Sequence, residues 1–174
     1  LTKASRYFAY PFDPEELRQK IEEECQACDS HQDYRLRISL SKSGEMELSR
    51  QVLTPLSPTF CKAKLCLQEA DLNQAFTYFK TTHRPHLSLG KQEIIYHNAA
   101  GELLETSIGN LVLKIAGKLY TPPTSLGILP GIYRQYLLER GQVEEKVLTL
   151  KDLAQAEAIY GCNAVRGLYE LEVI

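Results

Sequence analysis

The chain has 174 residues, of which 44% are hydrophobic, 24% charged and 9% aromatic, and this is the composition of an ordinary globular protein. Its 20 basic and 22 acidic residues give a net charge of −2. This balance argues against a nucleic-acid-binding domain, because such a domain carries a basic excess. The sequence has no apolar run of about 18 residues and no signal-like start, so we expect a cytoplasmic protein with no membrane partner.

The five cysteines form an odd number at irregular spacing, which predicts a reducing compartment rather than a secreted disulfide framework. Cys25 and Cys28, followed by Cys61 and Cys66, could be interpreted as four zinc ligands. However, the period of a strand places Cys61 and Cys66 on opposite faces, where they cannot close one tetrahedron. We therefore expect buried or incidental thiols and no metal site.

The first helix is predicted by Asp13–Glu16, which supplies a capping carboxylate, a proline at the first helical position and acids in the first turn. This helix should run to about Cys28. Leu17, Ile21 and Cys25 recur every fourth residue and are expected on its buried side.

Two later helices are expected, at Ile132–Arg140 between Gly131 and Gly141, and at Thr149–Ala158 with Thr149 as the cap. Alternating and apolar runs predict strands at Tyr34–Leu40, Glu45–Leu53, Phe60–Leu67, Glu93–His97, Leu103–Ile115, Leu119–Pro122, Val143–Leu148, Ile159–Val165 and Tyr169–Val173. This order predicts an α+β fold with mixed or antiparallel sheets.

The prolines of the Pro55–Pro58 stretch interrupt the strand pattern and are the best candidate for a domain boundary. We expect a small N-terminal domain over residues 1–57 and a larger domain over residues 58–174.

Lys80 ends the aromatic run Phe76–Phe79, which we interpret as a strand. A lysine delivered into a partly buried site loses proton affinity, and its neutral amine can attack a carbonyl and form a Schiff base. From this residue alone, a strand-end lysine whose charge reaches solvent is the simpler interpretation.

Glu105 lies within the apolar run Leu103–Ile115, where a carboxylate is rarely left unpaired. It could accept a hydrogen bond from a protonated ring nitrogen, or it could face solvent by alternation, which on its own is the better interpretation. Asn110, expected on the same strand, could brace a site or cap a turn.

Two segments further on could bind an anion. The loop Gly127–Pro130 runs into the helix that Gly131 opens, and the free N–H groups of Gly131, Ile132 and Tyr133 would fit a phosphate. The sequence Cys162–Ala164 gives a small polar turn after an apolar strand. Many such junctions bind nothing, so each signal is weak alone.

Taken together and in order, these segments resemble the class IV, fold-type IV aminotransferases, which use pyridoxal phosphate. Within that group the chain is most similar to the 4-amino-4-deoxychorismate lyases, including the lyase-like domain fused to aminodeoxychorismate synthase component I. The segments that carry the resemblance span the chain: Ser5–Phe8, Tyr10–Asp13, Lys80–Arg84, Glu105–Leu111, Leu119–Pro123, Gly127–Arg134 and Cys162–Gly167.

The resemblance implies a role for each candidate residue. Lys80 matches the lysine that holds the cofactor covalently, and Glu105 the acid that pairs with the pyridinium nitrogen. Arg84, four residues after Lys80, fits the lyase branch, whereas the aminotransferases more often have a tyrosine at the next position, here Pro85. The cofactor-binding residues implied in this way are Lys80, Arg84, Glu105, Asn110, Gly131, Ile132, Tyr133, Asn163 and Ala164.

Three features depart from the family pattern. The family's phosphate-binding arginine should lie just before Leu1, so we expect it and the first strands of the small domain upstream of this sequence. The segment Arg84–Gln92 is shorter than the helix that the family places there. Tyr133 stands where relatives often have threonine, which removes a compact hydroxyl from the phosphate site.

By resemblance, the expected activity is release of pyruvate and 4-aminobenzoate from 4-amino-4-deoxychorismate, a step toward folate. The alternatives are an amino-acid aminotransferase that uses the same lysine, and a degenerate, non-catalytic domain of a fused synthase. The family also implies a homodimer.

Overall fold

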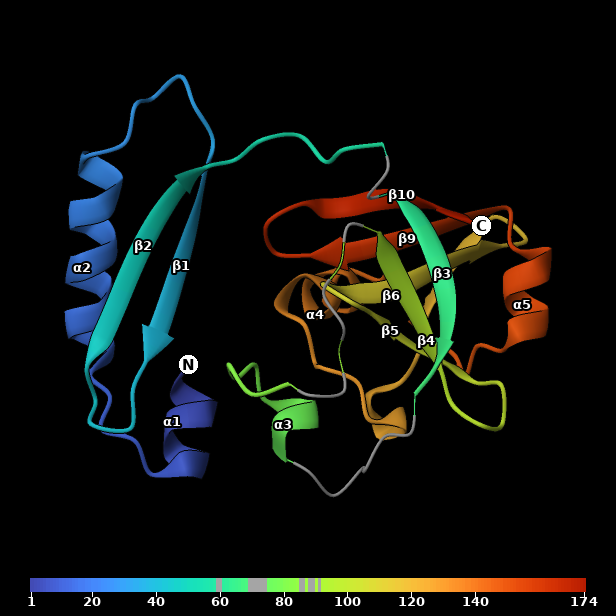
Figure 1. Cartoon of the computed structure of the whole chain (residues 1–174), viewed down its shortest axis with the longest axis horizontal. Coiled ribbons are helices and arrows are strands. Elements are labelled where there is room, and N and C mark those ends of the chain that lie inside the picture. Colours follow the sequence, from blue (N-terminus) through green and yellow to red (C-terminus); the bar gives the residue numbers. More distant parts are fainter. Residues whose placement is uncertain (59–60, 69–74, 85–86, 88–89, 91) are drawn as a thin grey trace. The chain divides into compact units, whose positions relative to one another are not determined.

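The computed structural model describes residues 1–58, 61–68, 75–84, 87, 90 and 92–174. These residues form two compact units, Leu1–Pro55 and Leu56–Ile174, which are described separately (Figure 1). The division between the units falls at the start of the proline-containing stretch.

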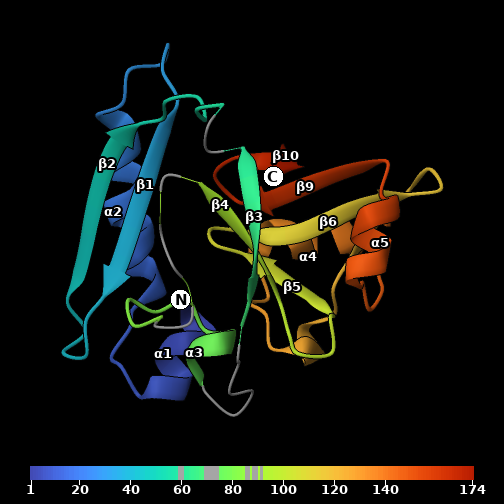
Figure 2. The same ribbon diagram turned by 45° about the vertical axis from the view of Figure 1, so that its right-hand side comes forward.

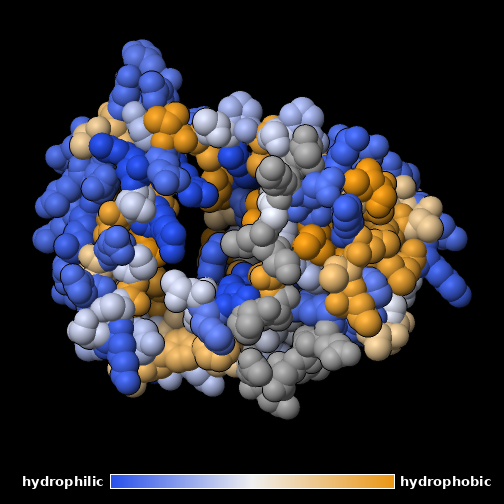
Figure 3. Space-filling view, in the orientation of Figure 1, coloured by the Kyte–Doolittle hydropathy of each residue, from blue (hydrophilic) through white to orange (hydrophobic). Residues whose placement is uncertain are grey.

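The first unit contains α1 (Thr2–Phe8), α2 (Pro14–Gln26) and an antiparallel hairpin of β1 (Tyr34–Leu40) and β2 (Met46–Val52). Two views show α2 lying along one face of the hairpin (Figures 1 and 2). On the face that Figure 3 shows, this unit carries mostly hydrophilic side chains. Helix α1 was not expected, because its N-cap Leu1 makes no side-chain cap and its first turn has no acid.

The start of α2 confirms the expected cap, since Asp13 Oδ1 accepts a hydrogen bond from the Glu15 N–H at 2.8 Å. The helix ends at Gln26, two residues before the predicted Cys28. The prediction that Cys25 faces inward is wrong, because this residue is exposed. Leu17 and Ile21 are half-buried as expected, and Arg50 on β2 donates to the carbonyl of Glu24 at 2.8 Å.

The second unit is built on an eight-stranded sheet of order β5-β4-β3-β10-β9-β6-β7-β8. Its strands are β3 (Lys62–Leu67), β4 (Glu93–His97), β5 (Leu103–Thr106), β6 (Asn110–Ile115), β7 (Lys118–Thr121), β8 (Glu144–Glu145), β9 (Ala158–Asn163) and β10 (Gly167–Val173). Because β5 also pairs with β6, the strands from β5 through β3 and β10 to β6 close into a ring. Helices α3 (Ala75–Tyr78), α4 (Ile132–Glu139) and α5 (Leu150–Gln155) belong to the same unit.

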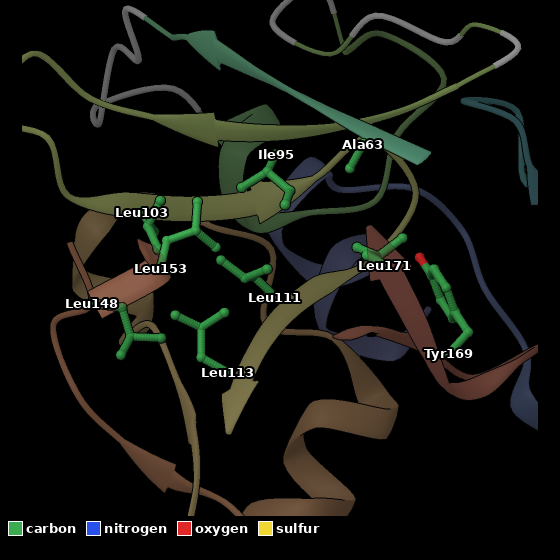
Figure 4. Close-up of a cluster of buried hydrophobic side chains, with 9 residues drawn as sticks. All are labelled: Ala63, Ile95, Leu103, Leu111, Leu113, Leu148, Leu153, Tyr169 and Leu171. Atoms are coloured by element: carbon green, nitrogen blue, oxygen red, sulfur yellow. The ribbon is translucent and has the colours of Figure 1, made fainter. Parts of the chain in front are cut away.

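The largest part of the core of this unit consists mainly of branched aliphatic side chains, most of them from strands, and Figure 4 shows Leu111 and Leu113 of β6 between Leu103 and Leu148. Ile95, Leu103, Leu111, Leu113 and Leu148 are fully inaccessible to solvent. Burying an aliphatic side chain contributes roughly 1.5–3 kcal/mol, so this cluster stabilises the strands that carry the candidate site.

The single strand expected over Leu103–Ile115 is two strands, β5 and β6, joined by a tight turn at Ser107–Gly109. The Thr106 N–H donates to the Gly109 carbonyl at 2.8 Å, and the Gly109 N–H donates to Thr106 Oγ1 at 3.0 Å. These bonds close the turn locally. Alternation of apolar residues on both sides hides it in the sequence.

Three further expectations need correction. Phe76–Lys80 is not a strand, because α3 occupies Ala75–Tyr78 and Lys80 follows it. The expected strand Val143–Leu148 is reduced to β8, and beyond Lys146 the chain turns to another partner, with the Leu148 carbonyl accepting from the Leu103 N–H. Helix α5 ends at Gln155, before the predicted Ala158, which begins β9.

Candidate active site

Glu105 and Asn110 stand directly opposite each other across the β5–β6 pair. They were expected on one strand, but the turn at Ser107–Gly109 places them on neighbouring strands. Both side chains are buried. The interpretation that Glu105 faces solvent is therefore wrong.

The Glu105 carboxyl has two partners in the described structure. Arg84 Nη2 donates to Oε1 at 3.2 Å, and the Leu129 N–H donates to Oε2 at 3.4 Å. Burial raises the pKa of Glu105 to about 7, against the opposing effects of Arg84, Leu129 and the charge of Lys80. The carboxyl is therefore poised between its two protonation states near neutral pH.

Asn110 fixes the loop that leads into α4. Its Nδ2 donates to the Leu129 carbonyl at 2.8 Å. A side chain at Gly131 would collide with Asn110 Oδ1, so the close approach of the loop requires a glycine there.

The N-terminus of α4 confirms the expected loop-to-helix junction, with Gly131 as the N-cap. No side chain caps this helix, and in the described part of the chain no acceptor meets the N–H groups of Ile132 and Tyr133. Ile132 is 79% exposed, so solvent reaches this end of the helix. These donors can therefore bind an anion.

The polar turn after β9 lies beside the start of α4. A Cβ atom on Gly167, just beyond this turn, would lie 3.3 Å from the Tyr133 hydroxyl. Asn163 Oδ1 accepts from the N–H groups of Val165 and Arg166, each at 2.9 Å, and its Nδ2 donates to the Ile108 carbonyl at 3.4 Å. The Asn163 side chain therefore stabilises the turn. Ala164 is exposed, so a ligand can reach the turn there.

Lys80 is exposed and follows α3. The chain beyond it is held by a hydrogen bond from Thr81 Oγ1 to the His83 carbonyl at 2.8 Å and by the Phe76 and His83 rings, whose centroids are 4.9 Å apart. Arg84 then contacts Glu105. Pro85, which stands where the aminotransferases have a tyrosine, lies outside the described residues, as do several positions of Arg84–Gln92.

Sequence reasoning did not identify Arg134, a buried residue of α4. Its Nη2 donates to the Pro122 carbonyl at 2.8 Å and pairs with Glu145 on β8, tying the first turn of α4 to the neighbouring strands. Glu93, Ser107 and Tyr169 were also missed, and they form a buried hydrogen-bonded cluster. In the sequence, Arg134 and Glu93 are marked only as single charged residues within apolar segments.

The described residues contain no group of three His, Cys, Asp or Glu side chains that could hold a metal ion. Within the same residues, no helix combines the length and apolarity needed to cross a bilayer.

The ring of strands carries an exposed lysine, a buried carboxyl and an uncapped helix start, and its fold is that of the fold-type IV pyridoxal-phosphate enzymes. The chain belongs to the class IV aminotransferase family, whose sequence profile it matches over residues 1–174. It superposes with a TM-score of 0.87 on a Mesorhizobium loti protein provisionally assigned as an amino-acid aminotransferase, at 25% identity over 99% of this chain and 87% of that one.

Two curated proteins are also similar. The aminodeoxychorismate lyase of Saccharomyces cerevisiae is 26% identical over an alignment of 187 positions, which covers 77% of this chain and 50% of the yeast protein. An uncharacterized protein of Haemophilus influenzae is 37% identical over 68 residues, which is 39% of this chain and 35% of that protein. The matches thus span half or less of the length of these relatives.

Enzymes of this family use pyridoxal phosphate, and the side chains present fit that group. The cofactor needs an amine, an acid for its ring nitrogen and donors for its phosphate. The site offers the Lys80 amine, the buried Glu105 carboxyl and the uncapped N–H groups of α4. Arg84 Nε is also buried with no hydrogen-bond partner in the described structure, and so adds an unused donor.

Proposed function

We propose that this chain carries the cofactor site of a pyridoxal-phosphate-dependent 4-amino-4-deoxychorismate lyase, which releases pyruvate and 4-aminobenzoate. The observation that carries the proposal is the 3.2 Å ion pair between Arg84 and Glu105. Arg84 lies four residues after Lys80. An arginine at this position fits the lyase branch of the family. The likeness to the yeast aminodeoxychorismate lyase over 77% of the chain supports the same branch.

The residues that would hold the cofactor are spread over four segments of the second unit. Lys80 would bind it covalently, and Glu105 would face its ring nitrogen, with Arg84 and Asn110 beside that carboxyl. The N–H groups of Ile132 and Tyr133, with the Asn163–Ala164 turn, would hold its phosphate. The Gly131 N–H was expected to share this role, but it donates to the Leu129 carbonyl at 2.8 Å. When bound, the cofactor supplies an electron sink.

In the reaction, Lys80 Nζ would take the proton from the substrate carbon that bears the amino group. Cleavage of the bond between the neighbouring ring carbon and the enolpyruvyl oxygen would then make the six-membered ring aromatic. The released enolpyruvate would take up a proton and become pyruvate. Lys80 is exposed, so a substrate can reach its amine from solvent. Glu105, whose pKa of about 7 leaves it partly ionised at neutral pH, would face the ring nitrogen, and its buried contact with Arg84 favours the ionised form.

The second candidate is a class IV amino-acid aminotransferase, which the likeness to the Mesorhizobium loti protein favours. It would use the same lysine but would pass the amino group to a keto acid in a second half-reaction. The experiment is to supply the protein and pyridoxal phosphate with 4-amino-4-deoxychorismate and to follow pyruvate.

A parallel reaction contains an amino acid and 2-oxoglutarate and is followed for glutamate. The proposal expects pyruvate without any added keto acid, and its loss in Lys80→Ala. Glutamate formation without pyruvate release would identify the aminotransferase instead. If protein that binds the cofactor forms neither pyruvate nor glutamate, both candidates are contradicted.

A further inference from the structure

A second buried carboxyl, that of Glu93 at the start of β4, lies beneath the turn that joins Glu105 to Asn110. Ser107, in that turn, donates from its hydroxyl to Glu93 Oε1, and the Tyr169 hydroxyl on β10 donates to Oε2 at 3.1 Å. The three residues are distant in sequence and come from three parts of the ring of strands. Glu93 is wholly inaccessible to solvent.

The same turn is tied to β4 through its backbone. The Ser107 N–H donates to the Ile94 carbonyl at 3.0 Å, and the Ile94 N–H donates to Ser107 Oγ at 3.3 Å. The backbone N–H and the hydroxyl of Ser107 therefore both bond to residues of β4. The position of the turn depends on the Glu93 end of that strand.

Tyr169 holds the other side of the turn. Its ring packs so closely on Gly161 that no Cβ atom could be added there, and its hydroxyl would lie 3.0 Å from a Cβ on Gly109. Figure 4 shows the tyrosine at the edge of the apolar cluster. Two glycines thus give the hydroxyl access to Glu93 beneath the turn.

Among the described residues, no cation pairs with Glu93, which sets it apart from Glu105 with its partner Arg84. Burial raises the pKa of Glu93 above its usual value, although Ser107 and Tyr169 oppose this shift. Glutamine has the shape of glutamate and keeps a carbonyl oxygen that accepts from one hydroxyl, while its amide group can donate to the other. An apolar side chain would remove the group to which both hydroxyls donate.

We infer that Glu93 is a positioning residue for the cofactor site, which acts through Ser107 and Tyr169 to fix the turn between Glu105 and Asn110. The inference rests on the proposed function only in naming the ligand of that site. A shift of the turn would move the Glu105 carboxyl and the Asn110 amide together, and with them both bonds to Leu129.

The test compares Glu93→Leu and Glu93→Gln with the wild-type protein. Amide hydrogen exchange without cofactor reports the turn at residues 107–110, and an absorbance titration reports the affinity for pyridoxal phosphate. We expect Glu93→Leu to speed exchange in the turn by on the order of tenfold and to weaken binding by a similar factor. Glu93→Gln should restore both.

The matched control is Glu170→Leu, since Glu170 is exposed on β10 beside Tyr169, and it should leave both readouts unchanged. Wild-type exchange and affinity in a folded Glu93→Leu would overturn the inference. So would faster exchange throughout the second unit without rescue by Gln, which indicates general structural support. If Glu93→Leu does not fold, Ser107→Ala and Tyr169→Phe decide by the same criteria. The exchange result stands whichever reaction the protein catalyses.

Discussion

Glu105 and Asn110 each form a hydrogen bond with the backbone of the same residue, Leu129. Glu105 Oε2 accepts from its N–H at 3.4 Å, and Asn110 Nδ2 donates to its carbonyl at 2.8 Å. Leu129 lies two residues before the N-cap of α4. The pair that would face the cofactor ring is thereby coupled to the helix start that would hold the phosphate.

This coupling predicts that Gly131→Ala weakens cofactor binding. The added methyl group would displace Asn110 Oδ1 and release its bond to Leu129. Loss of one buried hydrogen bond costs about 1–3 kcal/mol, so affinity for pyridoxal phosphate in an absorbance titration should fall about tenfold or more.

The control for Gly131→Ala is Gly90→Ala, because a Cβ at Gly90 meets its nearest described neighbour at an ordinary 3.9 Å. Equal affinities for the two variants would contradict the coupling.

The pKa of Glu105, raised from 4.5 to about 7, predicts how the stability of the cofactor-free protein depends on pH. Between these values the folded protein binds a proton that the unfolded chain has released, so the free energy of unfolding falls as pH rises from 4.5 to 7. The loss amounts to about 3 kcal/mol and is complete above pH 7.

Urea unfolding of wild-type and Glu105→Gln proteins between pH 4.5 and 8 isolates this contribution, because Gln cannot titrate. As pH rises, the free energy of unfolding of the wild-type protein should fall relative to that of Glu105→Gln. A constant difference would show that Glu105 is ionised throughout.

Leu111→Ala should be strongly destabilising. Leu111 is fully inaccessible at the centre of the ring of strands, and emptying such a position costs about 2–5 kcal/mol. Leu65→Ala on β3 is the control, since Leu65 is 41% exposed. Denaturant unfolding should separate the two variants clearly, and similar small losses would mean that the core is packed differently.

Local signals predicted much of this fold. Asp13 marks a helix start through its capping carboxylate, Gly131 is the N-cap of α4, and Thr149 closes a capping box with Asp152. Such signals lie within four residues of the feature that they predict. For this reason β1 agrees with its predicted bounds exactly, and β2 does so within one residue at each end.

The errors arise where long-range contacts decide the structure. Glu93 and Tyr169 are 76 positions apart, and nothing local marks either as a partner of the other. The turn between Glu105 and Asn110 is hidden because apolar residues continue on both sides. The order of Lys80, Glu105 and the α4 loop was nevertheless enough to suggest the family, which the sequence profile confirms.

Lys80 is the residue that we propose binds pyridoxal phosphate covalently. The most direct measurement is borohydride reduction of the cofactor-loaded protein, followed by peptide mapping to find the modified lysine. We predict one modified peptide, containing Lys80, and none in Lys80→Ala. A modification at another lysine, or one that persists in Lys80→Ala, would contradict the account.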